Sequence, residues 1–326
     1  MRYEEQVLHS EQIELVPAQC RTEEDVIAAC RDADALINQY APISRKVIER
    51  LEACRVITRY GVGVNTVDLP AATEKGICVA NVPDYCRDEV SDHALALMLA
   101  WTRKVTVAHQ AVKSGCWDFK VTQPIVRLRG RTLGLVGFGN IPQVLAQKAK
   151  PLGLRVIAYD PYVPEAAAAA CGVKLVTLDE LCASAYFISV HAPLTQSTEG
   201  MIGEQQLAAL KAGAIVINTS RGPVIDERAM IETLQAGRSA GAALDVVECE
   251  PIPPDNPLLA MENVILTPHV AWYSEEAAAE MRTKAAMGVA DVLLYGEYPK
   301  YLVNKEVKQR LHLKECCPEN RYTALV

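Results

Sequence analysis

Three ionisable side chains stand at the ends of short apolar runs that the sequence predicts to be strands. Arg221 follows AIVINTS, Glu250 follows AALDVV, and His269 closes VILTPH. An imidazole titrates near neutral pH, which makes His269 a candidate general acid and base. Glu250 would pair with it, favour its protonated form and fix its orientation. The forked donors of Arg221 suit a bound carboxylate. The chemistry indicated is proton transfer beside a carboxylate.

Each of these residues also has an ordinary structural interpretation. A histidine before an apolar run is often structural, Glu250 precedes Pro251 and could cap a turn, and Arg221 could lie on the surface. The catalytic interpretation depends on the three side chains meeting in space. We favour it because all three are placed at strand ends.

A second motif predicts a nucleotide site. A buried strand ends at Gly137-Phe138-Gly139, and a helix begins at once. Gly137 allows a tight turn, Gly139 lets the backbone approach a pyrophosphate, and the helix N-terminus offers free N–H groups. Asp160 ends the next predicted strand, where a carboxylate accepts hydrogen bonds from a ribose 2′-OH and repels a 2′-phosphate. The motif predicts NAD and not NADP, although Pro142 replaces its third glycine.

These motifs lie within two series of alternating strands and helices. The first series predicts strands over 13–19, 35–40, 56–61 and 77–82, with helices over 23–31 and 44–53. The second predicts strands over 132–138, 155–160, 174–178, 187–192, 214–220, 242–247 and 264–269. Long helices are predicted from Ser91 to 112 and over 275–296. Such alternation is typical of parallel sheets with helices on both faces.

The order of five motifs resembles the D-isomer-specific 2-hydroxyacid dehydrogenase family. The motifs are RYGVGVNTVD (59–68), HAPLT (191–195), NTSRG (218–222), LDVVECEP (244–251) and TPHVAW (267–272). Two further stretches, VPDYCRDEVSDHALALMLA and PHVAWYSEEAAAEMR, most resemble the branch that contains the C-terminal-binding-protein corepressors and their bacterial dehydrogenase relatives.

The resemblance implies an α/β protein with two doubly wound parallel-sheet domains. An NAD-binding Rossmann domain over 99–296 would be inserted into a flavodoxin-like substrate domain formed by 1–98 and 297–326. The implied activity is hydride transfer between NAD(H) and a small 2-keto acid or D-2-hydroxy acid. A homodimer formed through the nucleotide-binding domain is also implied.

The resemblance assigns roles to individual residues. Arg221, Glu250 and His269 take the catalytic roles described above, with Arg221 and His269 also contacting the cofactor. The other cofactor-binding residues that it implies are Gly137, Gly139, Asn140, Ile141, Asp160, Ala192, Pro193, Thr198, Thr219, Ser220 and Asp245. Asp245 would accept a hydrogen bond from the nicotinamide carboxamide, and His191 would lie beside the cofactor without being a catalyst.

The substrate would be held by Arg221, His269 and the backbone of Val62 and Gly63. Tyr85 and Trp272 would form walls of the pocket, although each could equally be a packed aromatic residue. Large apolar walls favour a small or apolar substrate side chain over a phosphorylated one.

The chain also departs from the family pattern. Asn140 and Pro142 replace residues of the usual GRIG tetrapeptide, and Asn65 replaces a common Asp. The sequence predicts that the chain begins inside the family's first helix, at Tyr3 to His9, so that the usual first strand of the substrate domain would be missing. The segment 301–326 or another element would have to fill its place.

Composition narrows the classes of protein. With 326 residues, half of them apolar, the chain is long enough for two domains. A net charge of −7 with scattered basic residues argues against a nucleic-acid surface. No leader-like segment or run of about 18 apolar residues is found, so we expect a cytoplasmic protein with no membrane partner. The 11 cysteines lack a CxxC spacing, so no metal site is expected.

Two other functions remain open. The first is an NAD(H)-sensing scaffold of the corepressor kind, which would recruit peptides through its first domain. The second is a formate or phosphite dehydrogenase, which is disfavoured because formate members of the family carry Gln at the position of Glu250.

Overall fold

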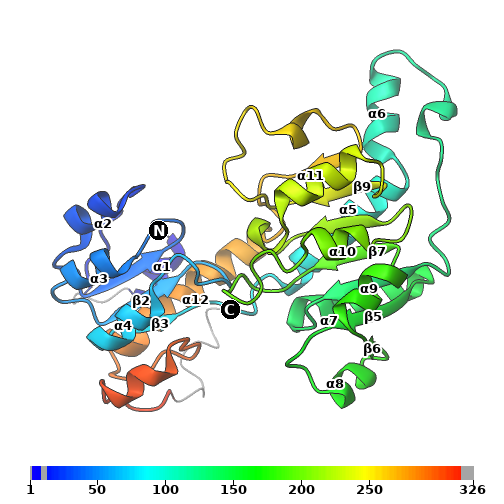
Figure 1. Ribbon diagram of the computed structural model, residues 1–326. Helices are drawn as coiled ribbons and strands as arrows, with labels where there is room; N and C mark the ends of the chain where they lie inside the picture. The colour runs from blue at the N-terminus through cyan, green and yellow to red at the C-terminus, as the bar shows by residue number, and fades with distance from the viewer. Residues whose placement is uncertain (1, 9–12, 317–326) are drawn as a thin grey trace. The chain divides into compact units, whose positions relative to one another are not determined.

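The computed structural model describes residues 2–8 and 13–316, which form two compact units. Unit 1 comprises the described residues of 1–85 and 274–326, and unit 2 comprises 86–273. Both are α/β, with parallel sheets covered by helices (Figure 1).

Unit 2 contains a seven-stranded parallel sheet in the order β10-β9-β8-β7-β4-β5-β6. Its strands are β4 (Thr132–Val136), β5 (Arg155–Tyr159), β6 (Lys174–Leu175), β7 (Phe187–Val190), β8 (Ile215–Asn218), β9 (Gly241–Leu244) and β10 (Val264–Leu266). Six of them lie within the predicted strands of the second series, and β9 begins one residue before the range predicted for it. The chain runs outward from β4 to β6 and then returns to the other side of β4 at β7. The carboxyl end of β4 is therefore the switch point at which such sheets bind nucleotides.

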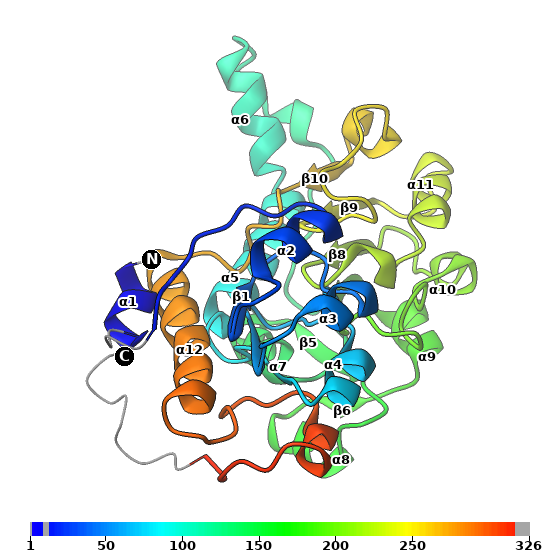
Figure 2. The ribbon, with the colours of Figure 1, turned by 90° about the vertical axis from the view of Figure 1, so that its left-hand side faces the viewer.

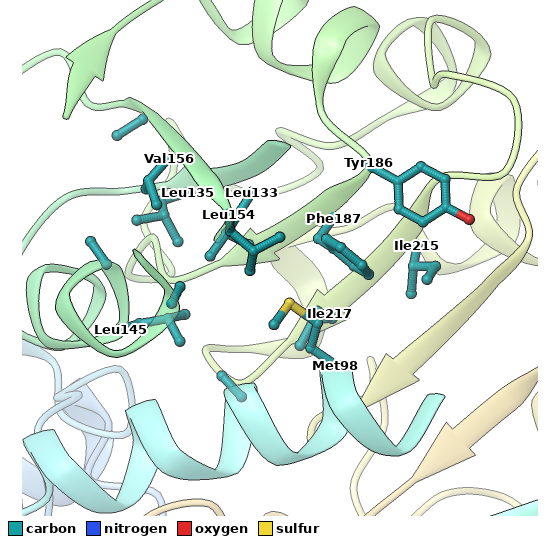
Figure 3. Packing of buried hydrophobic residues seen from close by; sticks show 14 of the residues in the cluster. Met98, Leu133, Leu135, Leu145, Leu154, Val156, Tyr186, Phe187, Ile215 and Ile217 are labelled. Atoms are coloured by element: carbon teal, nitrogen blue, oxygen red, sulfur yellow. The ribbon is translucent and has the colours of Figure 1, made fainter. Parts of the chain in front are cut away.

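Helices cover both faces of this sheet because alternate side chains of each strand point to opposite faces. Leu133, Leu135, Ile215 and Ile217 pack with α5 (Arg87–Thr102) and α7 (Asn140–Ala149), where Met98 of α5 points toward the strands (Figure 3). Val136, Ile188 and Val216 pack on the other face. The helices on that face are α9 (Leu178–Ser184), α10 (Glu204–Ala208) and α11 (Glu227–Gln235), and α8 (Glu165–Ala170) packs on β6.

Unit 1 has a smaller parallel sheet in the order β1-β2-β3, formed by Ala35–Asn38, Val56–Arg59 and Cys78–Ala80. One face packs on α2 (Glu23–Cys30), α3 (Arg45–Arg50) and α4 (Leu69–Lys75). The other face packs on α12 (Glu275–Leu293), beside which lies α1 (Arg2–Leu8) (Figure 2). Helices thus cover both faces of this sheet, but its strand order does not reverse within the described residues, so the expectation of a doubly wound sheet is not met in unit 1.

The strand predicted over 13–19 is wrong. Residues 13–20 belong to no helix or strand, and most of their side chains are exposed. Pro17 cannot donate a ladder hydrogen bond, which weakens a strand at its centre. Ile13 and Leu15 still pack against the core that includes α12.

The single helix predicted from Ser91 to 112 is also wrong, because the structure has two helices. The first, α5, begins at Arg87, and α6 spans Val105–Lys113. Between them Lys104 adopts a left-handed conformation with φ of 53°, which interrupts the helical path. Its ammonium lies 4.2 Å from the centre of the Trp101 ring.

The described part of the C-terminal segment lies at the β3 edge of the unit 1 sheet. Leu302 forms an antiparallel bridge with Ala80, and the N–H of Val303 donates to the carbonyl of Val79 at 2.8 Å. Asn304 accepts from the N–H of Val79 at 2.8 Å. The remainder of the segment proposed to replace a missing strand, 317–326, lies outside the described residues.

The two long helices lie in different units from those implied by boundaries at 98 and 297. All of α5 packs in unit 2, where Trp101 donates to the carbonyl of Asn263 at 3.1 Å. All of α12 packs in unit 1, where Ala286 and Val289 contact the core of the small sheet. Packing in the core therefore assigns α5 to the sheet of unit 2 and α12 to the sheet of unit 1. The spacing of residues in the sequence does not reveal this packing.

Candidate active site

The three candidate catalytic residues follow three neighbouring strands of unit 2. Arg221 comes after β8, Glu250 after β9 and His269 after β10, and these strands pair in the order β10-β9-β8. The pairs Asn218–Leu244 and Leu244–Leu266 are in register, so the three loops leave the sheet at one level. Adjacent strands are about 4.8 Å apart, which brings the loops together at one edge.

His269 and Glu250 form a close pair. The Nδ1 atom of His269 lies 2.6 Å from Oε2 of Glu250, and the other carboxylate oxygen accepts from the N–H of Val247 at 3.3 Å. The side chains are 26 % and 37 % exposed, so the pair is anchored yet accessible to a reactant. Because Nδ1 faces the carboxylate, Nε2 is the ring atom left for a reacting group.

Arg221 is held by its own loop. Asn218, which is buried, donates from Nδ2 to the carbonyl of Arg221 at 2.9 Å. The next residue must be glycine, because a Cβ atom on Gly222 would lie 1.9 Å from the carbonyl oxygen of Val247. The loop with Arg221 therefore packs directly on the loop that leads to Glu250.

A buried carboxylate organises the turn that carries His269. Asp245 is 2 % exposed, and its Oδ1 accepts from the hydroxyl of Thr267 at 2.6 Å and the N–H of Val270 at 2.9 Å. Its Oδ2 accepts from the N–H of Ala271 at 2.9 Å, and its backbone carbonyl accepts from the N–H of His269 at 2.8 Å. His269 itself has φ of 53°, a left-handed conformation that non-glycine residues seldom adopt.

The candidate nucleotide loop follows β4 at the switch point. Gly137 has φ of 91°, and a Cβ there would lie 3.0 Å from the backbone nitrogen of Ala192. A Cβ on Gly139 would meet open space, and α7 begins immediately afterwards at Asn140 and Ile141. Pro142 is buried in the first turn of α7, where its missing N–H removes no helical hydrogen bond.

Asp160, after β5, faces this loop. Its Oδ2 accepts from the N–H of Phe138 at 2.8 Å, and its Oδ1 accepts from the N–H of Tyr162 at 2.9 Å. The carboxylate is thereby fixed at the carboxyl end of β5, next to the glycine loop. This is where the carboxylate of the dinucleotide motif stands in a Rossmann fold.

The remaining cofactor candidates follow β7 and β8. Thr198 is buried and donates to the carbonyl of Pro193, and the N–H of Thr195 donates to its hydroxyl at 2.8 Å. Ser220 donates from Oγ to Oδ1 of Asn218 at 2.8 Å. The hydroxyl of Thr219 is buried and forms no hydrogen bond within the described residues, so it is free to bind a polar ligand.

Together these residues fit a dinucleotide. The glycine loop leaves open space at Gly139, a helix N-terminus follows it, and an orphan hydroxyl lies after a neighbouring strand. Among the described residues, no cluster of His, Cys, Asp or Glu could hold a metal ion. None of the helices within the described ranges is long and apolar enough to cross a membrane.

His191 lies after β7, with Nε2 at 2.8 Å from the hydroxyl of Ser189. Part of the residue remains accessible, but the ring is enclosed by protein, and burial lowers the pKa of His191 to about 3. The imidazole is therefore neutral at physiological pH. A neutral, hydrogen-bonded ring is better suited to lining a site than to donating a proton.

The candidate substrate residues are divided between the units. Val62 and Gly63 follow β2 of unit 1, where Asn81 donates to the carbonyl of Val62 at 2.6 Å. Tyr85, also in unit 1, is buried. Trp272 lies in unit 2, next to the His269 turn, with its ring edge-on to Tyr273. The structure therefore brings the catalytic candidates together within unit 2 alone.

Sequence reasoning missed one contact to this site. His93, His109, His312 and His9 have no neighbouring motif, and the sequence by itself predicts structural or exposed positions for all four. His109 and His312 are exposed, and His9 lies outside the described residues. The ring of His93 instead lies 3.0 Å from the hydroxyl of Thr267. No sequence signal identifies this contact, because 174 residues separate the partners.

Comparison with known proteins agrees with this architecture. Residues 95–271 match the family model for the NAD-binding domain of D-isomer-specific 2-hydroxyacid dehydrogenases. Over 285 residues the chain is 44% identical to D-3-phosphoglycerate dehydrogenase of Methanocaldococcus jannaschii, covering 87% of this chain and 54% of that protein. It is 42% identical to glyoxylate reductase of Korarchaeum cryptofilum, covering 86% of each.

Solved structures agree as well. The crystal structure of a glyoxylate reductase from Paecilomyes thermophila matches with a TM-score of 0.83 and 29% identity, covering 93% of each chain. The chain thus spans about half the length of the phosphoglycerate dehydrogenase and most of both glyoxylate reductases. These relatives carry dehydrogenase and reductase names, and the finer resemblance to the corepressor branch stays a prediction.

Proposed function

The chain belongs to the D-isomer-specific 2-hydroxyacid dehydrogenase family, and on that premise we propose that it interconverts a small 2-keto acid and its D-2-hydroxy acid with NAD(H). The observation that carries the proposal is the 2.6 Å contact of His269 with Glu250, beside the loop that holds Arg221. When bound, NAD(H) supplies or accepts the hydride at C2 of the substrate.

The chain's own residues would bind the substrate and move a proton. Arg221 binds the substrate carboxylate through paired N–H groups and polarises the carbonyl. In the direction of reduction, Nε2 of His269 donates a proton to the oxygen at C2. Glu250 stabilises the imidazolium before this transfer, and the same ring accepts the proton in the reverse direction.

For the cofactor we propose that Gly137, Gly139, Asn140 and Ile141 receive the pyrophosphate. The carboxylate of Asp160 binds the ribose, which makes NAD the preferred dinucleotide. The orphan hydroxyl of Thr219 supports a polar contact from the loop after β8. The other proposed contacts are Ala192, Pro193, Thr198, Ser220, Arg221, Asp245 and His269.

For the substrate we propose that the backbone of Val62 and Gly63 shares the carboxylate with Arg221. Tyr85 and Trp272 would line the side-chain end of the pocket. Aromatic walls favour a small or apolar 2-keto acid. A phosphorylated keto acid that is turned over as fast as glyoxylate would contradict this part of the proposal.

The proposal is tested by following NADH oxidation with a panel of 2-keto acids. We expect at least one small keto acid to be reduced, and His269→Ala to lower kcat by about 10²–10⁴-fold, as for the loss of a general acid. If the protein binds NADH but reduces none of the acids, the NAD(H)-sensing scaffold becomes the better interpretation.

We also propose a homodimer formed through an arm of unit 2. The arm consists of α6 and the segment 114–122, and α6 projects from the rest of the unit (Figure 1). None of the α6 residues is buried, and the arm carries exposed Val105, Val112, Trp117 and Phe119. Trp117 is 89% exposed and Phe119 is 72% exposed. Such exposure of neighbouring large apolar side chains is unusual for a monomer and marks a site of protein–protein contact.

Analytical ultracentrifugation tests the dimer. The wild type should sediment at twice the mass of the chain, and a Trp117→Ser, Phe119→Ser double variant should sediment as a monomer. Tyr162→Ser is the matched control, since Tyr162 is 85% exposed but lies outside the arm. A monomeric wild type, or a dimer insensitive to the arm variant, would contradict the arm as the interface.

We retain a cytoplasmic location as a proposal. Cell fractionation would test it directly.

A further inference from the structure

His93 on α5 is linked to the turn that carries His269. Its Nε2 lies 3.0 Å from the hydroxyl oxygen of Thr267 and 3.5 Å from Oδ1 of Asp245. Its side chain is 23 % exposed, whereas that of Asp245 is 1 % exposed. The contact therefore reaches from the second turn of a long helix to a buried carboxylate that holds the turn of His269.

The hydrogen-bond directions follow from counting protons. A threonine hydroxyl has one proton, and the 2.6 Å contact of Thr267 with a carboxylate assigns that proton to Asp245. The oxygen of Thr267 can then only accept from the ring of His93. Nε2 of His93 therefore carries a hydrogen, and the three residues form a directed chain of donors that ends at Asp245.

Asp245, which accepts the last hydrogen bond of this series, also holds the backbone around His269. Its two oxygens accept from the N–H groups of Val270 and Ala271, and its carbonyl accepts from the N–H of His269. The turn needs such support because His269 has a left-handed φ of 53°. A residue in a sparsely populated conformation persists only where its surroundings over-determine it.

We propose that His93 is a positioning residue for the reaction, which acts through Thr267 and Asp245 to keep the imidazole of His269 aligned with Glu250. The inference rests on the proposed function, because it assigns His93 a role in the proton transfer of His269. His93 touches neither the reacting atoms nor Glu250. Its effect should appear in the rate of the chemical step more than in cofactor binding.

Three substitutions at His93 separate positioning from packing. His93→Leu keeps much of the volume but loses the donor. His93→Gln places an amide N–H near the position of Nε2, and His93→Asn places one near Nδ1, too short to reach Thr267. We expect His93→Leu and His93→Asn to lower kcat about tenfold or more, because small misplacements of catalytic groups are costly. His93→Gln should restore kcat to within about threefold of the wild type.

Two measurements accompany the rates. Thermal unfolding should show all three variants folded, and the Kd for NADH, followed by fluorescence, should change less than about twofold. Equal kcat in all variants would overturn the proposal. The proposal would also be overturned if His93→Leu lowers kcat and His93→Gln does not restore it. The lost feature would then be a packing contact of the imidazole and not a positioned hydrogen-bond donor.

A readout that does not need turnover keeps this test separate from that of the function. Long-range ¹H–¹⁵N spectra should show a strongly hydrogen-bonded Nδ1 proton on His269, assigned by its loss in His269→Ala. The signal should weaken in His93→Leu and return in His93→Gln. An unchanged signal in His93→Leu overturns the positioning role, whereas a wild type that reduces no keto acid but shows the expected spectra overturns only the proposed function.

A double-mutant cycle tests the route through Thr267. Thr267→Val removes the hydroxyl at nearly constant shape and should lower kcat at least as much as His93→Leu. The double variant should be no slower than Thr267→Val alone, because both changes break one chain of hydrogen bonds. Additive losses would show that the two residues act independently and would overturn the proposed route.

Discussion

At the scale of single residues, the geometry of the site depends on which atoms of each polar side chain already form hydrogen bonds within the protein. Glu250 uses one oxygen for the N–H of Val247 and the other for His269, so its position relative to the imidazole is set by its own loop. Asp245 directs most of its hydrogen-bonding capacity to the turn of His269. Its contact with the nicotinamide, implied by family resemblance, therefore stays a proposal.

Removing the charge of Glu250 should slow the reaction without removing the hydrogen bond. Glu250→Gln keeps an acceptor for the ring N–H but no longer stabilises the imidazolium. Because hydrogen bonds to charged groups contribute about 1.5–3 kcal/mol, we expect kcat for keto-acid reduction to fall about 10- to 100-fold. Steady-state kinetics measure this. Glu248→Gln, an exposed neighbour in the same loop, is the control that should stay near wild type.

Asp160 should decide which dinucleotide the protein uses. Its carboxylate is fixed beside the glycine loop, where it would repel a 2′-phosphate. We expect kcat/KM to be at least about tenfold higher with NADH than with NADPH. Asp160→Asn removes the charge, and its single amide oxygen can accept from only one of the two backbone N–H groups. We expect this variant to narrow the ratio of NADH to NADPH efficiency. Comparable rates of the wild type with both dinucleotides would refute this role.

At the scale of elements, the register of β8, β9 and β10 brings together three loops that are distant in the chain. The match of Asn218, Leu244 and Leu266 sets the level at which each loop begins. The contact of Gly222 with Val247 then holds the first two loops against each other. Buried, β-branched strands of a parallel sheet are well suited to fixing such a register.

Gly222 should therefore tolerate no side chain. In Gly222→Ala the Cβ would lie 1.9 Å from the carbonyl oxygen of Val247, which is backbone and cannot move without moving the loop of Glu250. We expect a loss of about 1–3 kcal/mol in the free energy of unfolding, as for an overpacked site, and a larger loss in kcat than in NADH affinity. Chemical denaturation and kinetics together measure this. A variant with wild-type stability and rate would contradict the predicted loop packing.

At the scale of the whole molecule, the chain forms two units. Unit 2 is one continuous segment of the sequence, and unit 1 is formed by the two segments that precede and follow it. Unit 2 contains both large hydrophobic clusters, the glycine loop and the three catalytic candidates. Unit 1 contains Val62 and Gly63, and its sheet has only three described strands. The groups proposed to bind the cofactor and to transfer the proton thus lie in unit 2. The backbone groups proposed to bind the substrate carboxylate lie in unit 1.

Residues 86–273, expressed alone, should fold and bind NADH but reduce no keto acid. A domain with its own core and a continuous chain is expected to fold independently. Circular dichroism and NADH fluorescence would report folding and binding, and the full-length chain serves as the activity control. A fragment that reduces keto acids as fast as the full chain would contradict the assignment of substrate contacts to unit 1.

The amino-acid sequence alone determined the class of fold and the approximate positions of the strands of unit 2, and it supplied the candidate site residues. These features depend on local patterns: apolar runs, a glycine turn before a helix, and polar residues at strand ends. The same local reasoning failed at 13–19, where apolar residues predict a strand but the structure has no ladder, and at Lys104, where one backbone angle divides a helix.

Only the tertiary structure decided which loops meet, how His269 is held and which unit each long helix joins. Those outcomes depend on strand order and on side-chain packing between residues far apart in the chain. His93 and Thr267 show the physical reason most clearly, because a 3.0 Å hydrogen bond between residues 174 positions apart leaves no trace in spacing or composition.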